Sequence, residues 1–194
     1  QEEMKKIFII ASLLLVSMAG IAQDKQPVYK SSFFGIRSDG ATDNTTSIQK
    51  AIDFISEKGG GTLEFSVGRY LTGSVQLKDG VDIYLREGAV IVGSTNIYSY
   101  KGAKGIFWGE GVKDVTIEGK GVIDGRGPGL LDNIDGQIKM RHIDNPVIPT
   151  LVYLKDCQNV SLKNFILRYP ATKDDLYIIE GGSVTVEGCY TDTK

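Results

Sequence analysis

The chain of 194 residues contains 24 glycines, and its 22 Lys and Arg residues nearly balance its 24 Asp and Glu residues, giving a formal net charge of −2. Glycine without a strict repeat excludes collagen, and a hydrophobic content of 41% excludes wholesale disorder. Because no excess of positive charge is available for a phosphate backbone, we expect no nucleic-acid partner, and the length is that of one domain.

Residues 4–22 are predicted to be a signal peptide. Met4-Lys5-Lys6 precede an apolar run, small residues follow it, and cleavage is expected after Ala22. The run is shorter than the roughly 18–20 residues of a bilayer-spanning helix, so a retained anchor is the weaker alternative. We therefore expect an exported protein, periplasmic or extracellular, with no membrane partner after signal removal. It would span residues 23–194, and residues 1–3 are interpreted as upstream sequence.

A single amphipathic helix is predicted over residues 47–58. Its apolar stripe consists of Ile48, Ala51, Ile52 and Ile55. Asn44 and Thr46 are candidate caps, and Thr46 with Gln49 matches a capping box. Three glycines at 59–61 end the helix. The stripe implies that the helix lies with one face on an apolar surface.

After the three glycines, the apolar period changes from that of a helix to that of a strand. The apolar positions are Leu63 and Phe65; Tyr70; Val75 and Leu77; Val81, Ile83 and Leu85; Val90 and Val92; Val115 and Ile117; Val122; Leu151 and Tyr153; Val160 and Leu162; Ile178; and Val184 and Val186. Gly, Asp and Asn residues separate these short segments, as in turns. The sequence therefore predicts an all-β protein.

An internal repeat distinguishes a solenoid from a sandwich. Val115–Gly119, Val160–Asn164 and Val184–Gly188 share the order apolar, hydroxyl, apolar, charged, then Gly or Asn, at separations of 45 and 24 residues. A unit of about 22–24 residues is typical of a coil that turns once around an elongated core. A β-sandwich explains the alternation but not the recurring register. We therefore predict parallel strands, each followed by a turn residue with positive φ.

Cys157 and Cys189 leave the disulfide question open. An oxidising compartment would permit a bridge between them. Their local contexts differ and neither belongs to a Cys-x-x-Cys motif. Because cysteine is among the most buried residue types, we favour buried free thiols in successive strands.

Several motifs carry a resemblance to a known family. The matching segments are Phe34–Thr45, which contains Asp39-Gly40-Ala41-Thr42-Asp43-Asn44, followed by Ile48–Ile52, Gly59–Leu63, Gly68–Gly73 and Leu85–Ser94, with looser matches at Val122–Gly125 and Cys157–Val160. In these segments the chain resembles the polygalacturonase family (glycoside hydrolase family twenty-eight) of the pectate-lyase-like superfamily. The resemblance implies a right-handed parallel β-helix whose N-terminal end is closed by the predicted helix.

The resemblance also implies inverting hydrolysis of pectic polysaccharide, which needs an acid carboxyl and a base carboxylate. The family takes these from Asn-Thr-Asp and Asp-Asp segments, followed by Gly-His-Gly and Arg-Ile-Lys, and none is present here. Residues 184–190 resemble the rung before Asn-Thr-Asp. We therefore expect the catalytic residues beyond Lys194, and expect this chain to be an inactive N-terminal portion, truncated at its C-terminus.

The chain itself offers only weak candidates for a site. Asp174 and Asp175 lie one rung too early for the family pair, and Asp192 has Tyr190-Thr191 before it in place of Asn-Thr; for Asp174 and Asp175 a solvated turn is the favoured interpretation. Weak candidates for substrate binding are Lys139, Arg141 and His142. Lys139 and Arg141 could bind a sugar carboxylate, although solvated charge is the favoured interpretation, and His142 is interpreted as a loop or rung-edge histidine. No His, Cys or acidic cluster has metal-ligand spacing, so no metal or cofactor is expected.

Two alternatives to hydrolysis remain open. One is a binding or adhesive β-helix that displays a carbohydrate-binding face. The other is a polysaccharide lyase, which would use calcium and a basic residue. In each case the expected partner is a polysaccharide such as pectin or galacturonan, and the full-length protein is expected to be a monomer.

Overall fold

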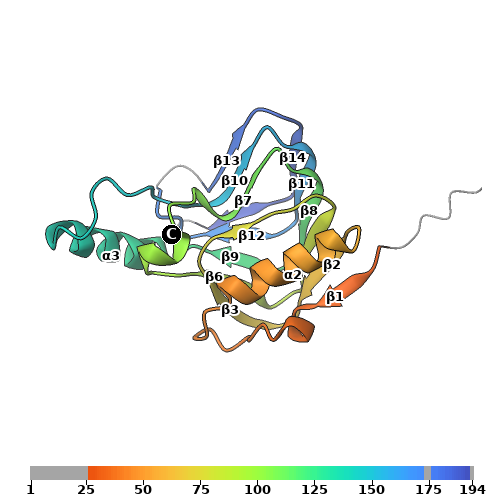
Figure 1. Cartoon of the computed structure of the whole chain (residues 1–194), viewed down its shortest axis with the longest axis horizontal. Helices are drawn as coiled ribbons and strands as arrows, with labels where there is room; N and C mark the ends of the chain where they lie inside the picture. The colour runs from red at the N-terminus through yellow and green to blue at the C-terminus, as the bar shows by residue number, and fades with distance from the viewer. Residues whose placement is uncertain (1–25, 173–175, 193–194) are drawn as a thin grey trace, which may run out of the picture.

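The computed structural model describes residues 26–172 and 176–192, and its strands form three parallel sheets (Figure 1). Sheet A contains β1 (Val28–Lys30), β2 (Gly61–Phe65), β5 (Val81–Leu85), β8 (Lys113–Gly119), β11 (Gln158–Lys163) and β14 (Val184–Glu187). Sheet B contains β3 (Gly68–Thr72), β6 (Ala89–Gly93), β9 (Val122–Asp124), β12 (Ile166–Arg168) and β15 (Tyr190–Asp192). Sheet C contains β4 (Val75–Gln76), β7 (Gly105–Glu110), β10 (Thr150–Lys155) and β13 (Tyr177–Glu180).

The chain visits sheets A, B and C in turn, so it winds as a coil in which each strand pairs with its counterpart one rung later. This is the right-handed parallel β-helix that the sequence predicts, in the hand that parallel crossovers favour. The predicted repeat is confirmed residue by residue, because Val160 pairs with both Val115 and Val184. The turn residues after these strands, Asn164 and Gly188, have φ of 64° and 62°, as predicted.

The predicted capping helix is α2 (Thr45–Glu57), and its buried residues are Ile48, Ala51, Ile52 and Ile55, the predicted stripe. It packs against β2, β4 and β5 and closes the first rung of the coil. The predicted capping box does not form. Instead the side-chain amide of Gln49 binds the free edge of β4, accepting from the Gln76 N–H at 2.7 Å and donating to the Gln76 carbonyl at 3.1 Å.

The same rung is also closed along sheet B, by the loop between η1 (Ser31–Phe34) and α2. Gly40 N–H donates to the Arg69 carbonyl at 2.8 Å, and Asn44 N–H donates to the Leu71 carbonyl at 2.9 Å. Gly40 has φ of 72°, and a Cβ there would lie 3.2 Å from that of Arg69. The Asp-Gly-x-Thr motif therefore fixes this loop against β3.

A second helix, α3 (Gly127–Lys139), was not expected from the sequence. Gly127, Pro128 and Gly129 open it, and glycine and proline lower helix propensity. Its buried apolar residues, Leu130 and Ile134, are only one turn apart and give a weak period. The helix projects from the coil as an arm (Figure 1).

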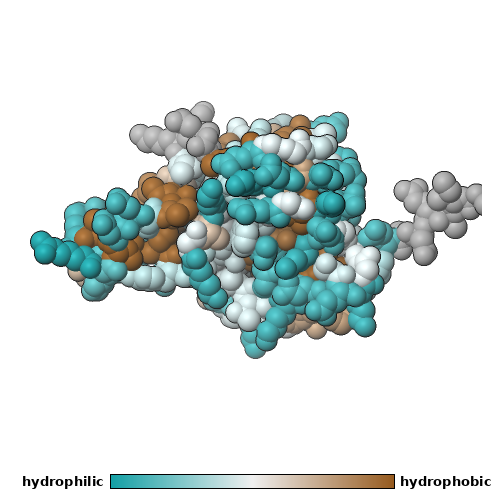
Figure 2. Space-filling model, turned by 45° about the horizontal axis from the view of Figure 1, so that its top comes forward, coloured by the Kyte–Doolittle hydropathy of each residue, from teal (hydrophilic) through white to brown (hydrophobic). Residues whose placement is uncertain are grey.

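The arm carries apolar side chains on its surface, and Figure 2 shows them as a brown area on the projecting part of the molecule. Exposed apolar residues of this segment are Leu131, Ile138, Met140, Val147 and Ile148. Within residues 26–172 and 176–192, no helix has the length and apolar character needed to cross a membrane. The predicted signal peptide lies outside the described residues.

Two local expectations need correction. Val90 and Val122 face outward from sheet B, and the core takes Ile91 and Ile123, because strands with apolar residues on both faces do not reveal which face is inside. Both cysteines are free, as predicted, but they lie in turns rather than in strands. Cys157 is buried between β10 and β11, and Cys189 is partly buried between β14 and β15.

Replacing Asn44 should destabilise the capped end of the coil. Its side chain is 1% exposed, accepts from Arg37 N–H at 2.8 Å, and donates to the carbonyls of Arg37, Thr42 and Leu71 at 2.9 to 3.3 Å. We expect Asn44→Ala to lower the free energy of unfolding by about 2–4 kcal/mol, since it leaves buried backbone groups unpaired. Urea unfolding checks this, with the exposed Thr46→Ala as the control; equal losses for the two variants would contradict the role of Asn44.

The loop also predicts a pH dependence. Hydrogen bonds from Thr42 N–H, Thr42 hydroxyl and Ala41 N–H lower the pKa of Asp39 to about 2. Because the folded-state pKa lies below the unfolded value of about 3.9, the stabilisation is present above that unfolded value and is lost as pH falls toward 2. NMR titration should give this low pKa and a higher one in Thr42→Val, which lacks the hydroxyl donor. An unchanged pKa in the variant would show that the hydroxyl does not contribute.

Candidate functional site

Aromatic and charged side chains lie together on the outer face of sheet C, which is the candidate site. Gln76, Trp108, Tyr153 and Ile178 pair across successive strands and form one row. Their chain neighbours Val75, Phe107 and Val152 are buried in the core. Because side chains alternate along a strand, the row faces away from the core.

A second row on this face is charged. Lys155 of β10 pairs with Glu110 of β7 on one side and with Glu180 of β13 on the other. Opposite charges on adjacent strands stabilise the pairing. The two glutamates are two strand spacings apart, roughly 10 Å between Cα atoms. Lys155 lies between them in the register. We assign the two glutamates no catalytic role.

Tyr153 links the two rows. Its ring is 1% exposed, and its hydroxyl donates to Glu180 Oε2 at 2.8 Å and accepts from Lys104 Nζ at 2.9 Å. Lys104 Nζ also lies 4.6 Å from the centroid of the Tyr153 ring, within cation–π range. The hydrogen bond to Tyr153 raises the pKa of Lys104, and the charges of Glu180 and Glu110 add to the effect. The network therefore holds a fixed cation at this face.

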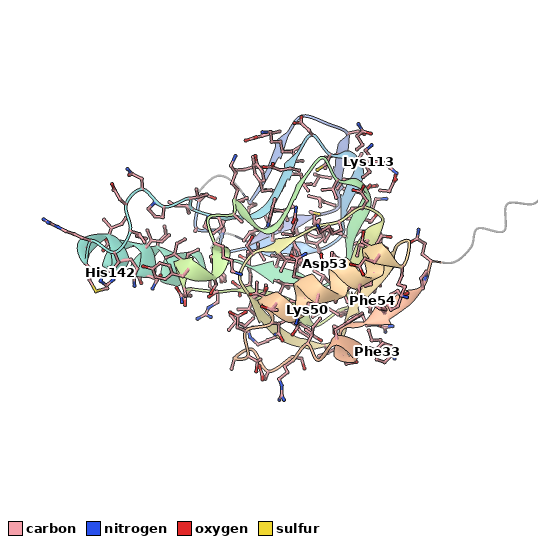
Figure 3. All side chains as sticks on the ribbon, in the orientation of Figure 1. Phe33, Lys50, Asp53, Phe54, Lys113 and His142 are labelled. Atoms are coloured by element: carbon pink, nitrogen blue, oxygen red, sulfur yellow. The ribbon has the colours of Figure 1, made fainter. Side chains whose placement is uncertain are left out.

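A cavity of about 400 Å³ continues the outer face at the β4 edge. Gln76 and Trp108 contribute to its lining from sheet C, α2 lines one side, and Tyr100 of η2 (Ile97–Tyr100) with the residues after it lines another. Figure 3 shows two of the α2 lining residues, Lys50 and Asp53, on the helix. Trp108 thus lies where the sheet face meets the capping helix.

The sequence-predicted binding residues are elsewhere. Lys139 is at the end of α3, where its Nζ pairs with Asp135 Oδ2. Arg141 and His142 follow it and are exposed, and the His142 Nδ1 lies 3.1 Å from Gln137 Oε1. Figure 3 shows His142 on the projecting arm, well away from Lys50 and Asp53. The structure thus does not bring these three residues to the face of sheet C.

Of the acidic candidates, only Asp192 lies within the described residues. Asp174 and Asp175 lie outside the described residues. Asp192 ends β15 in sheet B, where it is exposed and pairs with Arg168 in the register. Among residues 26–172 and 176–192, no group of three His, Cys, Asp or Glu side chains is placed to hold a metal ion.

Sequence reasoning missed Trp108, Tyr153 and Lys104. A signal for the first two was available, because Trp108 and Tyr153 are 45 residues apart, the separation of Val115 and Val160 in the detected repeat. Extending the repeat to the preceding segments would have placed both aromatics at one position of neighbouring rungs. Lys104 precedes its strand, outside the repeat, and carries no such signal.

The chain matches a family model and is similar to solved structures. Residues 32–193 match a family model described as rhamnogalacturonase A/epimerase, pectate lyase-like. The fold superposes on a "putative glycosyl hydrolase" of Parabacteroides merdae with a TM-score of 0.82 and 39% identity, covering 86% of this chain and 75% of that one.

Two curated relatives are matched over part of their length. An exo-poly-alpha-D-galacturonosidase of Dickeya chrysanthemi is 34% identical over 119 residues, which cover 48% of this chain and 19% of that protein. A "probable polygalacturonase" of Vitis vinifera is 29% identical over 154 residues, 68% of this chain and 31% of that protein. The chain thus spans less than a third of the length of either relative.

Removing the Tyr153 hydroxyl should test the network on sheet C. We expect Tyr153→Phe to lower the free energy of unfolding by about 1 kcal/mol and to bring the pKa of Lys104 down toward its ordinary value, because the main cause of the raised pKa is lost. Urea unfolding and NMR titration of the lysine measure the two effects. Tyr98→Phe is the matched control, because Tyr98 is 51% exposed and its hydroxyl donates to the surface residue Gln137. Equal losses in both variants would contradict the assignment.

Proposed function

Because this chain belongs to the rhamnogalacturonase A/epimerase, pectate lyase-like family, we propose that it forms the N-terminal, polysaccharide-binding part of an exported hydrolase acting on pectic polysaccharide. The chain is a glycoside hydrolase-like β-helix related to polygalacturonases. Activity, substrate and export are the steps that we propose. Export is supported by the signal-like sequence of residues 4–22.

The observation that carries the proposal is the row on the outer face of sheet C. Trp108 and Tyr153 occupy the same position on neighbouring rungs, and Lys104 adds a cation beside them. Stacked rungs present an extended surface that repeats along the coil. Such a surface suits a polymer whose own unit repeats. The half-buried Trp108 ring offers a flat apolar face to the C–H groups of a sugar, while the buried Tyr153 positions Lys104 through its hydroxyl.

Inverting hydrolysis needs two carboxyl groups about 6.5–9.5 Å apart on opposite sides of the scissile bond. One would protonate the leaving oxygen while the other, as a base, removes a proton from the attacking water. We place this pair on rungs after Lys194 in the whole protein. This placement is supported by the missing Asn-Thr-Asp and Asp-Asp segments and by the small share of the galacturonosidase and polygalacturonase relatives that the chain covers.

The test is the activity of the whole protein on polygalacturonate. We expect release of reducing sugar, with inversion at the anomeric carbon observed by NMR of the fresh product. Binding of the polymer without release would instead favour a carbohydrate-binding β-helix, and an unsaturated product would favour a lyase. Absence of both binding and release would overturn the proposal.

A substitution on sheet C should weaken this activity. We expect Trp108→Ala in the whole protein to lower kcat/KM on polygalacturonate by about tenfold, the equivalent of ~1.4 kcal/mol, because the flat ring on the substrate face is lost. Tyr98→Phe, on η2, should leave kcat/KM unchanged. An unchanged kcat/KM in Trp108→Ala, with folding verified by circular dichroism, would show that the substrate does not use this face.

A further inference from the structure

We propose that the cavity between α2, β4 and η2 is a binding site for one anionic sugar unit, held on Trp108 by surrounding lysines. The proposal rests on the proposed function, since the cavity continues the same face of sheet C. It assigns the capping helix a second role, as a wall of a ligand site. A volume of about 400 Å³ is within the range of small-ligand pockets.

The charge of the lining favours an anion. Lys50, Lys78 and Lys101 line the cavity from three different segments, against the single carboxylate of Asp53. In the described part of the chain none of these lysines forms an ion pair, whereas Asp53 accepts a hydrogen bond from Gln49 Nε2 at 3.0 Å. Several lysines around a concave surface create a focused positive potential there. The ligand should therefore carry a carboxylate or a sulfate.

The remaining lining favours a sugar over a simple anion. Trp108 is half-buried and provides an aromatic surface. Hydroxyl groups of Thr46 and Ser74 also line the cavity, and Ser74 Oγ donates to the Gly105 carbonyl at 2.6 Å while its lone pairs can still accept. A ring with one apolar face, several hydroxyls and one negative group matches this combination of an apolar wall with a few polar groups.

The walls of the cavity are fixed by the fold rather than by a ligand. Gln49 is held by Gln76 on one side and Asp53 on the other. Thr45 Oγ1 accepts from Gly73 N–H at 2.7 Å and ties the start of α2 to the segment before β4. A site whose walls are already ordered loses less conformational entropy on binding.

Trp108, the single tryptophan of the given sequence, lines the cavity, so its fluorescence reports on binding there. The difference in signal between the whole protein and its Trp108→Phe variant isolates this contribution from that of other tryptophans. We would titrate the whole protein with D-galacturonate, a galactose sulfate and neutral galactose. We expect a saturable change with at least one of the anionic sugars, weakened by added salt, and a much smaller one with galactose. The two anionic arms distinguish carboxylate from sulfate recognition.

Lysine variants complete the test. The triple variant Lys50→Gln, Lys78→Gln and Lys101→Gln should raise the Kd for the anionic sugar at least tenfold. The matched control is Lys113→Gln, an exposed lysine that Figure 3 shows well apart from Lys50 and that does not line the cavity; it should leave Kd unchanged.

Equal affinity for galactose, no fluorescence change with either anionic sugar, or an unchanged Kd in the folded triple variant would each overturn the inference. Failure here is distinguishable from failure of the proposed function. If the whole protein still cleaves polygalacturonate, only the cavity assignment is wrong; if it neither binds nor cleaves that polymer, the proposed function is wrong as well.

Discussion

In-register stacking of inward-facing apolar side chains is the constraint on which the rest of this molecule depends. One such ladder in sheet A consists of Leu63, Ile83, Ile117, Leu162 and Val186. Because successive side chains alternate between faces, a slip of one residue would turn each of these side chains to the solvent. The same strand register determines which side chains lie on the outer faces. The pairing of the strands therefore sets both the packing of the core and the residues of the candidate site.

This constraint explains why much of the fold could be predicted from the sequence. A ladder needs similar residues at equivalent places, and the segments beginning at Val115, Val160 and Val184 reveal that equivalence directly. Elements outside the repeat have no equivalent segment elsewhere in the chain with which they can be compared. Helix α3 is an insertion between β9 and β10. The glycines and proline at its start lower the helix propensity, so the sequence does not predict it. The capping box between Thr46 and Gln49 is a plausible local pairing that a long-range contact with Gln76 displaces.

The candidate site was less predictable than the fold for a related reason. Lys139, Arg141 and His142 are binding candidates by residue type alone, and their spatial position depends on α3, an insertion that the apolar pattern does not predict. Trp108 and Tyr153 belong to the repeat, but their segments contain apolar residues on both faces, which hides the outward position. Only the pairing across rungs separates an outward-facing aromatic such as Trp108 from a core aromatic such as Phe107.

The Gln49 amide has a consequence for the direction in which the coil can grow. A strand edge offers backbone N–H and C=O groups to any other strand, which is how β proteins join into fibres. Here one side chain occupies both groups of Gln76, as a backbone amide of a neighbouring strand would. New strands can therefore add to sheet C only on the side away from α2, and during synthesis the finished end is made first. The covered edge thus gives the coil a polarity, with one closed end and one end to which further rungs can pair.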